Sequence, residues 1–184
     1  MSWNLVSLAS VPAQSWRNGG GVTRELLAWP QASDWCVRLS VADVQTSGPF
    51  SRFAGIERWF AVLEGDGLVL RSAFAEHHLT ADSDPFRFDG DLHIEAAPVR
   101  GPTRDFNLMA LPGRARMERV RGAAQVKGAA NALLALYAHG EPAVLRSVGA
   151  TIEVPPYHLA WRLAPEASHA DVQAQDALWM ETLT

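Results

Sequence analysis

The sequence predicts an all-β fold, organised as a sandwich or barrel, and two observations lead to that prediction. Residues 35–42 alternate between large apolar side chains and smaller or polar ones, a period of two that is typical of a strand. Short apolar runs recur along the chain between turn-forming pairs: Gly48-Pro49, Asp84-Pro85, Asp89-Gly90, Gly101-Pro102 and Pro112-Gly113. Many short strands with closely spaced turns favour such a fold.

The expected strands can be placed from these runs. Residues 58–64 and 68–71 flank Gly65-Asp66-Gly67, whose residues tolerate positive φ, so we expect a β-hairpin there. The charged segment 114–122 is typical of an exposed connection or an edge strand. Further strands are expected at 92–96 and 105–111 and, in a second and shorter β set, at 143–146, 151–154, 158–163 and 176–183.

One segment carries conflicting signals. Residues 129–138 are rich in alanine and leucine, which prefer helices, so propensity alone predicts a helix there. The surrounding strands and Gly-rich turns favour a strand instead.

Composition excludes several classes of protein. A net charge of −4 gives no electrostatic footprint for nucleic acid or for an anionic membrane. No run approaches the roughly 20 apolar residues of a membrane span, and the N-terminus lacks the pattern of a secretory signal. Cys36 is the only cysteine, so an intrachain disulfide is impossible. We therefore expect a cytoplasmic protein.

The run from Trp16 to Glu25 stands out because it combines three consecutive glycines with polar and charged side chains. Glycine permits positive φ and close approach of another group, and the flanking residues can orient a small anionic or polar ligand. A tight turn between strands with ordinary surface charges explains the same pattern, and composition does not decide between the two.

Several blocks together resemble the HutD/Ves family, and they span about the first 110 residues. These blocks are residues 16–25, 48–51, 63–65, 88–91 and 105–109, with Phe53, Gly55 and Arg58. The resemblance implies a bicupin, in which two fused double-stranded β-helix (jelly-roll) barrels form one chain. We expect an N-terminal barrel at 1–112 and a shorter C-terminal barrel at 113–184, packed as one unit. The family is associated with regulation of histidine utilisation, with formylglutamate or urocanate as candidate ligands and no established catalytic activity.

Many cupins hold a metal through histidines and a glutamate, and this chain departs from that pattern. Residues 62–67 resemble the end of the first cupin motif, which puts Arg58 at the usual Glu position and the paired His positions near Arg52 and Ala54. His77 and His78 are adjacent, so on a strand they point to opposite faces. We expect neither a metal nor another cofactor.

Arg58 is the main ligand-binding candidate. It shares a strand face with Phe60, Val62 and Glu64; if that face is interior, the guanidinium needs a protein carboxylate or an anionic ligand. The protein carboxylates that could pair with it are Glu25, Glu64 and Asp105. The ligand assignment follows mainly from the resemblance.

Five further residues are predicted to assist. Arg24 is the second anion candidate, Asn18 offers an amide, and Trp16 offers a stacking surface or, alternatively, half-buried packing. Asp105 and Asn107 share a face and could form a polar floor, or a hydrogen-bonded core pair. Arginine suits anion binding because its guanidinium can donate two parallel hydrogen bonds to one carboxylate.

Three functions follow as hypotheses. The first is a metal-free cupin that binds a small carboxylate metabolite as an accessory or regulatory protein of histidine utilisation. The second is a cupin enzyme, an isomerase or hydrolase acting on a small polar acid, although Ser51 and Cys36 lack any motif that would activate them. The third is an oligomeric scaffold with a vestigial pocket, since exposed sheet edges make a homodimer plausible.

Overall fold

A computed structural model describes residues 2–147 and 149–184, and it confirms the all-β prediction. The chain forms two compact units: one is the continuous segment Val11–Gly113, and the other combines the start of the chain, up to Ser10, with Arg114–Thr184. Among the described residues, no helix has the length and apolar character needed to cross a membrane.

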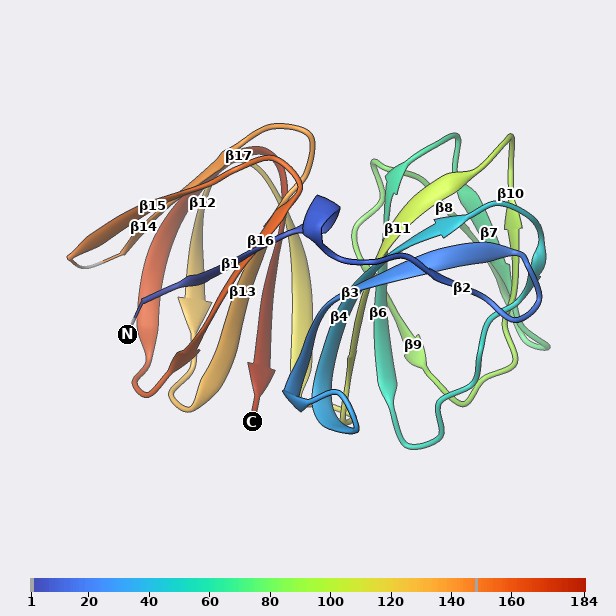
Figure 1. The fold of residues 1–184 in the computed structure, drawn as a ribbon, viewed down its shortest axis with the longest axis horizontal. Helices are drawn as coiled ribbons and strands as arrows, with labels where there is room; N and C mark the ends of the chain where they lie inside the picture. Colours follow the sequence, from blue (N-terminus) through green and yellow to red (C-terminus); the bar gives the residue numbers. More distant parts are fainter. Residues whose placement is uncertain (1, 148) are drawn as a thin grey trace. The chain divides into compact units, whose positions relative to one another are not determined.

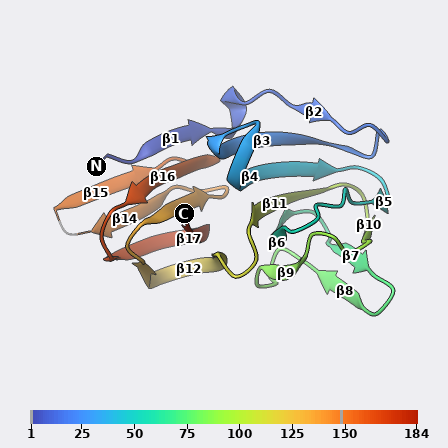
Figure 2. The ribbon, with the colours of Figure 1, turned by 90° about the horizontal axis from the view of Figure 1, so that it is seen from below.

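The Val11–Gly113 unit contains two sheets (Figures 1 and 2). The six-stranded sheet has the order β2 (Gln14–Ser15), β3 (Gly21–Gln31), β4 (Asp34–Val44), β11 (Thr103–Ala110), β6 (Glu57–Glu64), β9 (Phe86–Asp89). The four-stranded sheet has the order β5 (Gly48–Pro49), β10 (Glu95–Pro98), β7 (Leu68–Arg71), β8 (Glu76–Leu79).

The core of this unit lies between its two sheets. One hydrophobic cluster joins Phe60 and Val62 of β6 with Leu68 and Leu70 of β7. Burial of such side chains contributes roughly 1.5–3 kcal/mol each, which makes this packing the main force holding the sheets face to face.

The expected hairpin at residues 65–67 is wrong, although the strands on both sides of it are present. β6 pairs with β11 and β9, whereas β7 pairs with β10 and β8, so the glycine turn carries the chain from one sheet to the other. Gly65 has φ 99°, and a Cβ there would lie 2.6 Å from the carbonyl oxygen of Pro102. Glycine is needed here because the backbone has positive φ and lies close to another backbone segment. A hairpin and a crossing between sheets share these requirements, so the glycines do not distinguish the two.

The second unit is built on a seven-stranded sheet. Its order is β1 (Asn4–Ser7), β16 (His158–Ala164), β13 (Ala132–Ala138), β17 (Ser168–Leu183), β14 (Ala143–Ser147), β15 (Ala150–Val154), and β12 (Ala115–Gly128) also pairs with β17. A 3₁₀ turn, η1 (Leu8–Ser10), follows β1. β1 runs antiparallel to β16, so the chain's first strand lies in this unit and not with the region that follows it in sequence (Figure 1).

The helix that propensity alone predicts at 129–138 is wrong. Residues Ala132–Ala138 form β13, a strand hydrogen-bonded on both sides, to β16 and β17, with all seven residues buried. Alanine and leucine can fill both faces of a central strand, and cross-strand packing outweighs their helical preference, which amounts to a few tenths of a kcal/mol per residue. Segment 114–122 falls within the long strand β12, whose pairing in the described part of the chain is with β17 alone, as expected of an edge strand.

Candidate functional site: a cationic cavity in the Val11–Gly113 unit

A cavity of about 550 Å³ lies in the Val11–Gly113 unit. Its wall comes from the inward faces of β4, β6 and β11, from the segment that contains β2 and the residues after it, and from the chain that follows β5. This volume is within the range of small-molecule sites.

Strand alternation explains which side chains reach the cavity. On β4, Arg38 and Ser40 face inward, while Val37, Leu39 and Val41 lie on the other face with no exposed surface. Both faces of β4 are therefore covered. On the neighbouring strands the inward positions include Arg58 and Phe60 of β6 and Asn107 and Met109 of β11.

Arg58 is almost fully buried, with 5% of its surface exposed, and it lines the cavity. Its Nη2 donates a 2.6 Å hydrogen bond to Oδ1 of Asn107, and its Nη1 lies 3.5 Å from the carbonyl oxygen of Ser51. The guanidinium carbon is 4.9 Å from the ring centroid of Phe50 and 5.0 Å from that of Phe88. The expectation that this side chain points into the barrel is consistent with this placement.

The Arg58 guanidinium has no carboxylate partner among the described residues, and its Nε has no hydrogen-bond partner. Burial, together with the nearby positive charge of Arg38, lowers the pKa of Arg58 to about 9. The group is therefore still protonated at neutral pH, and it is a buried cation that lacks a counter-ion.

The three protein carboxylates considered as partners for Arg58 contact other groups. Glu25 accepts a 2.6 Å hydrogen bond from Nε of Arg38, and Glu64 pairs with Arg104 at 3.1 Å. Asp105 accepts a 2.8 Å hydrogen bond from Oγ1 of Thr103. A structural ion pair therefore does not account for the Arg58 charge.

Arg38 is a cavity residue that sequence reasoning missed. Its Nε is held by Glu25, and the side chain lines the same wall as Arg58. The two arginines occupy equivalent register positions, because Met109 lies opposite Arg38 on β4 and opposite Arg58 on β6. The alternation at 35–42 already places Arg38 on the strand face opposite the large apolar residues, and this pattern could have identified it as a candidate.

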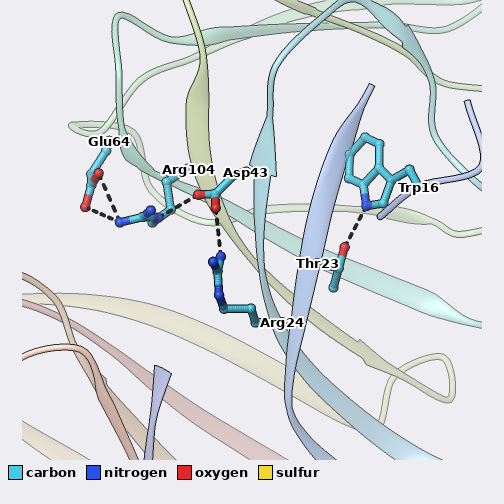
Figure 3. A network of polar contacts seen from close by, with 6 residues as sticks. All are labelled: Trp16, Thr23, Arg24, Asp43, Glu64 and Arg104. Atoms are coloured by element: carbon cyan, nitrogen blue, oxygen red, sulfur yellow. Dashed lines mark hydrogen bonds and ion pairs between the residues drawn. The ribbon is translucent and has the colours of Figure 1, made fainter. Parts of the chain in front are cut away.

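Trp16 and Asn18 line the cavity, as does Asn107. The indole Nε1 of Trp16 donates a 2.7 Å hydrogen bond to Oγ1 of Thr23 (Figure 3) and the ring packs edge-on against Phe50. Oδ1 of Asn18 accepts a hydrogen bond from the backbone N–H of Gly20. The glycine-rich segment is thus both a turn and part of the cavity wall.

Arg24 lies apart from the cavity. Its Nη1 donates to Oδ2 of Asp43 at 2.9 Å, and Oδ1 of Asp43 accepts from Nε of Arg104 at 2.7 Å. Arg104 also contacts Glu64, so the four side chains form one chain of alternating charges (Figure 3). The structure does not bring Arg24 together with Arg58.

Asp105 also does not line the cavity. It has no exposed surface, and its Oδ1 has no hydrogen-bond partner. Burial raises the pKa of Asp105 to about 8, against the opposing effect of the Thr103 hydrogen bond, and the nearby Asp43 adds to the rise. Its carboxyl is therefore neutral at pH 7, and it pairs with Thr103 inside the core.

The chemistry of the lining does not fit the metal that many cupins hold. Arg17, Arg38 and Arg58 line the cavity, and the described lining residues include no Asp, Glu, His or Cys. Metals of the cupin type require imidazole or carboxylate ligands, and guanidinium groups repel cations. The same donors suit an anion.

Comparison with known proteins agrees with this architecture. The HutD family model matches residues 8–180. An uncharacterized 21.2 kDa protein in the hutC 3' region of Pseudomonas putida is 34% identical over 134 residues, which are 71% of this chain and 70% of that protein. Protein Ves of Escherichia fergusonii is 38% identical over 104 residues, 55% of this chain and 54% of its own length.

Solved structures of related proteins share this architecture over nearly the whole chain. A conserved protein of unknown function from Pseudomonas aeruginosa PAO1, PA5104, has a TM-score of 0.86 and 30% identity, and covers 99% of this chain and 98% of its own. HutD from Pseudomonas fluorescens SBW25, solved in a formate condition, has a TM-score of 0.83 and 27% identity over the whole of both chains. An oxalate decarboxylase from Lactobacillus farciminis shares the cupin-like fold alone, with a TM-score of 0.66 at 8% identity and coverage of 98% and 85%. The chain therefore belongs to the HutD family, which is linked to the histidine-utilisation locus.

Proposed function

We propose that the protein binds a small carboxylate metabolite in the cavity of the Val11–Gly113 unit, without a metal, as an accessory or regulatory protein of histidine utilisation. Formylglutamate and urocanate are the candidate ligands. The observation that carries the proposal is Arg58, a residue with 5% of its surface exposed, whose guanidinium lines the cavity without a carboxylate partner in the described chain.

The physical argument rests on the cost of that charge. A buried and uncompensated ion costs several kcal/mol, and a bound carboxylate removes the cost by supplying the counter-charge. The Nη1 of Arg58 makes only a long contact, 3.5 Å to the carbonyl oxygen of Ser51, so we assign to this atom the hydrogen bond to a ligand oxygen. The rings of Phe50 and Phe88 beside the guanidinium exclude water and strengthen the electrostatic attraction.

Arg38 supports the same ligand class. Its Nε bond to Glu25 fixes the guanidinium at the cavity wall and leaves the charge of the pair close to neutral. Arg58 has no such compensation, so we assign it the primary contact with the carboxylate, and we assign Asn107 the role of holding Arg58 in position.

We also propose that each unit is a cupin barrel, which makes the chain a bicupin. The two facing sheets of the Val11–Gly113 unit, joined by one hydrophobic core, support this for the first barrel. The oxalate decarboxylase neighbour covers 98% of this chain, which supports a cupin-like arrangement throughout.

Thermal shift and calorimetry test the ligand proposal. A ligand that binds only the folded state stabilises it by RT ln(1 + [L]/Kd), so formylglutamate or urocanate should raise the melting temperature, and their neutral amides should not. Arg58→Met should abolish the shift. The matched control Arg87→Met, at an exposed arginine of the same unit, should retain it. The absence of a shift with any acid at millimolar concentration, or a full shift in Arg58→Met, would refute the proposal.

The same samples separate binding from catalysis. Chromatography of each acid after prolonged incubation with the protein should return it unchanged. Conversion of the acid to a product would instead establish the cupin enzyme alternative.

A further inference from the structure

Two polar side chains, Ser40 and Asn107, lie next to each other on the wall of the cavity, and we call them the Ser40–Asn107 pair. Ser40 of β4 lies directly opposite Asn107 of β11, and both residues line the cavity. Side chains at directly opposite positions of antiparallel strands have Cβ atoms roughly 4.5–5.5 Å apart. One ligand atom in the cavity can therefore contact both polar groups.

The contact with Arg58 fixes which way the Asn107 amide points. A guanidinium only donates hydrogen bonds, so the atom 2.6 Å from Nη2 of Arg58 is the amide oxygen. The NH₂ group of Asn107 remains as a donor, and no described residue accepts a hydrogen bond from it. Asn107 is 4% exposed, so this donor is shielded from bulk solvent.

The hydroxyl of Ser40 is also without a hydrogen-bond partner among the described residues. Ser40 is 3% exposed and faces the cavity, and the next inward residue of β4 is Ala42, which carries no polar group. A buried hydroxyl that lacks a partner destabilises the protein. The pair thus presents two neutral donors to whatever occupies the cavity.

The charges around the pair favour a neutral acceptor. Glu25 of β3 lies opposite Ser40, and its carboxylate compensates the charge of Arg38, so this side of the cavity offers no net positive charge. Arg17 also lines the cavity but is exposed, and an exposed charge contact contributes little. A second carboxylate would gain little here, whereas a carbonyl oxygen has two lone pairs for two donors.

We infer that the ligand is a carboxylate that also carries a neutral carbonyl oxygen, such as that of a ketone or an amide, and that the Ser40–Asn107 pair binds this second oxygen. The inference rests on the proposed function, because Arg58 must hold the carboxylate. Asn107 connects the two contacts, since its amide oxygen accepts from Arg58 while its NH₂ group donates to the ligand. The carbonyl therefore lies within a few bonds of the carboxylate.

Calorimetric titration with acids of one chain length tests this inference. Pentanoate, 2-oxopentanoate and 4-oxopentanoate carry the same single charge, and each oxo acid has a carbonyl in place of one methylene. We expect at least one oxo acid to bind about tenfold more tightly than pentanoate, because pentanoate leaves both donors of the pair without an acceptor. Glutarate, which has a second carboxylate on the same chain length, should bind more weakly than that oxo acid.

Ser40→Ala removes one donor of the pair without touching Arg58. The affinity for the preferred oxo acid should fall about fivefold, while the affinity for pentanoate should not change, which also shows that the site is intact. Ser47→Ala, at an exposed serine of the same unit that does not line the cavity, is the matched control and should keep the wild-type preference.

The outcomes separate this inference from the proposed function. Equal affinities for pentanoate and both oxo acids, tighter binding of glutarate, or an equal loss for both kinds of acid in Ser40→Ala would overturn the inference and leave the carboxylate contact of Arg58 standing. Failure of all four acids to bind at millimolar concentration would refute the proposed function, and the inference with it.

Discussion

The buried carboxyl of Asp105 makes the stability of this protein depend on pH in a direction opposite to that of an ordinary ion-paired acid. Burial raises the pKa of Asp105 from 3.8 to about 8. Below pH 4 the carboxyl is protonated in both the folded and the unfolded chain. Between pH 4 and 8 only the unfolded chain releases the proton, so unfolding becomes more favourable as pH rises, and above pH 8 the effect is constant.

The size of this effect follows from the pKa difference. Each unit of difference is worth 1.36 kcal/mol, so the Asp105 carboxyl lowers the free energy of unfolding by on the order of 5 kcal/mol between pH 4 and 8. Asp105 has no exposed surface, so solvent does not screen the effect. Asp105→Asn is similar in shape and does not ionise. The variant should therefore gain stability over the wild type progressively across this range.

Urea denaturation at half-unit steps from pH 4.5 to 8.5 measures the difference directly. We expect the free energy of unfolding of Asp105→Asn minus that of the wild type to rise by several kcal/mol with pH. Asp66→Asn, at an exposed aspartate, should show no such trend. A difference that stays constant with pH would show that the Asp105 carboxyl ionises normally, and would refute the burial argument.

Three further substitutions test individual contacts, each by urea denaturation without ligand. Asn107→Leu removes the 2.6 Å acceptor of the Arg58 guanidinium and should lower the free energy of unfolding by about 2 kcal/mol; a neutral result would mean that Arg58 finds another acceptor. Gly65→Ala places a Cβ 2.6 Å from a backbone oxygen at a residue with φ 99°, and it should lower the free energy of unfolding by about 3 kcal/mol. Gly55→Ala, where φ is 74° and no atom beyond the adjacent residues lies within 4 Å, should lower it by about 1 kcal/mol. Equal losses at both positions would argue against the steric clash. Leu136→Ala, at a fully buried site of β13, should cost about 2–5 kcal/mol, whereas Leu5→Ala, at a half-exposed site, should cost much less.

The position of Arg58 could be predicted only in part. Side chains alternate along a strand, so Arg58 shares a face with Phe60 and Val62, but the opposite face is equally apolar and alternation does not decide which face is interior. The family resemblance placed Arg58 at the position of a cupin metal ligand, and the inward orientation stayed a condition of the prediction.

The position of Arg24 depends on strand register, which the sequence does not show. Arg24 lies opposite Val41 on β4, whereas Glu25 lies opposite Ser40, a cavity residue. Arg24 and Glu25 are neighbours on a strand, so only one of the two side chains can point into the cavity. Arg24 is the predicted one because a positive charge suits an anionic ligand. The register instead puts Glu25 on the cavity side, beside Arg38.

Long-range pairing also explains the other differences. Whether residues 65–67 make a hairpin depends on which strands pair with β6 and β7. β6 pairs with β9 and β11, and β7 pairs with β10 and with the next strand, β8, so neither strand pairs with the other. The strand at Ala132–Ala138 is likewise fixed by β16 and β17, which follow it in the chain. Local propensity carries no information about such partners.

The pairing of β1 with β16 has a practical consequence for dissecting the molecule. The cavity-bearing unit is one uninterrupted stretch, Val11–Gly113, so a fragment with these bounds keeps every strand of its two sheets. The other unit combines residues up to Ser10 with Arg114–Thr184. A fragment that starts at Arg114 would therefore leave one side of β16 unpaired and would lack Trp3, whose ring lies against the Arg162 guanidinium. To obtain that unit by itself, residues 2–10 must be joined to the fragment through a linker.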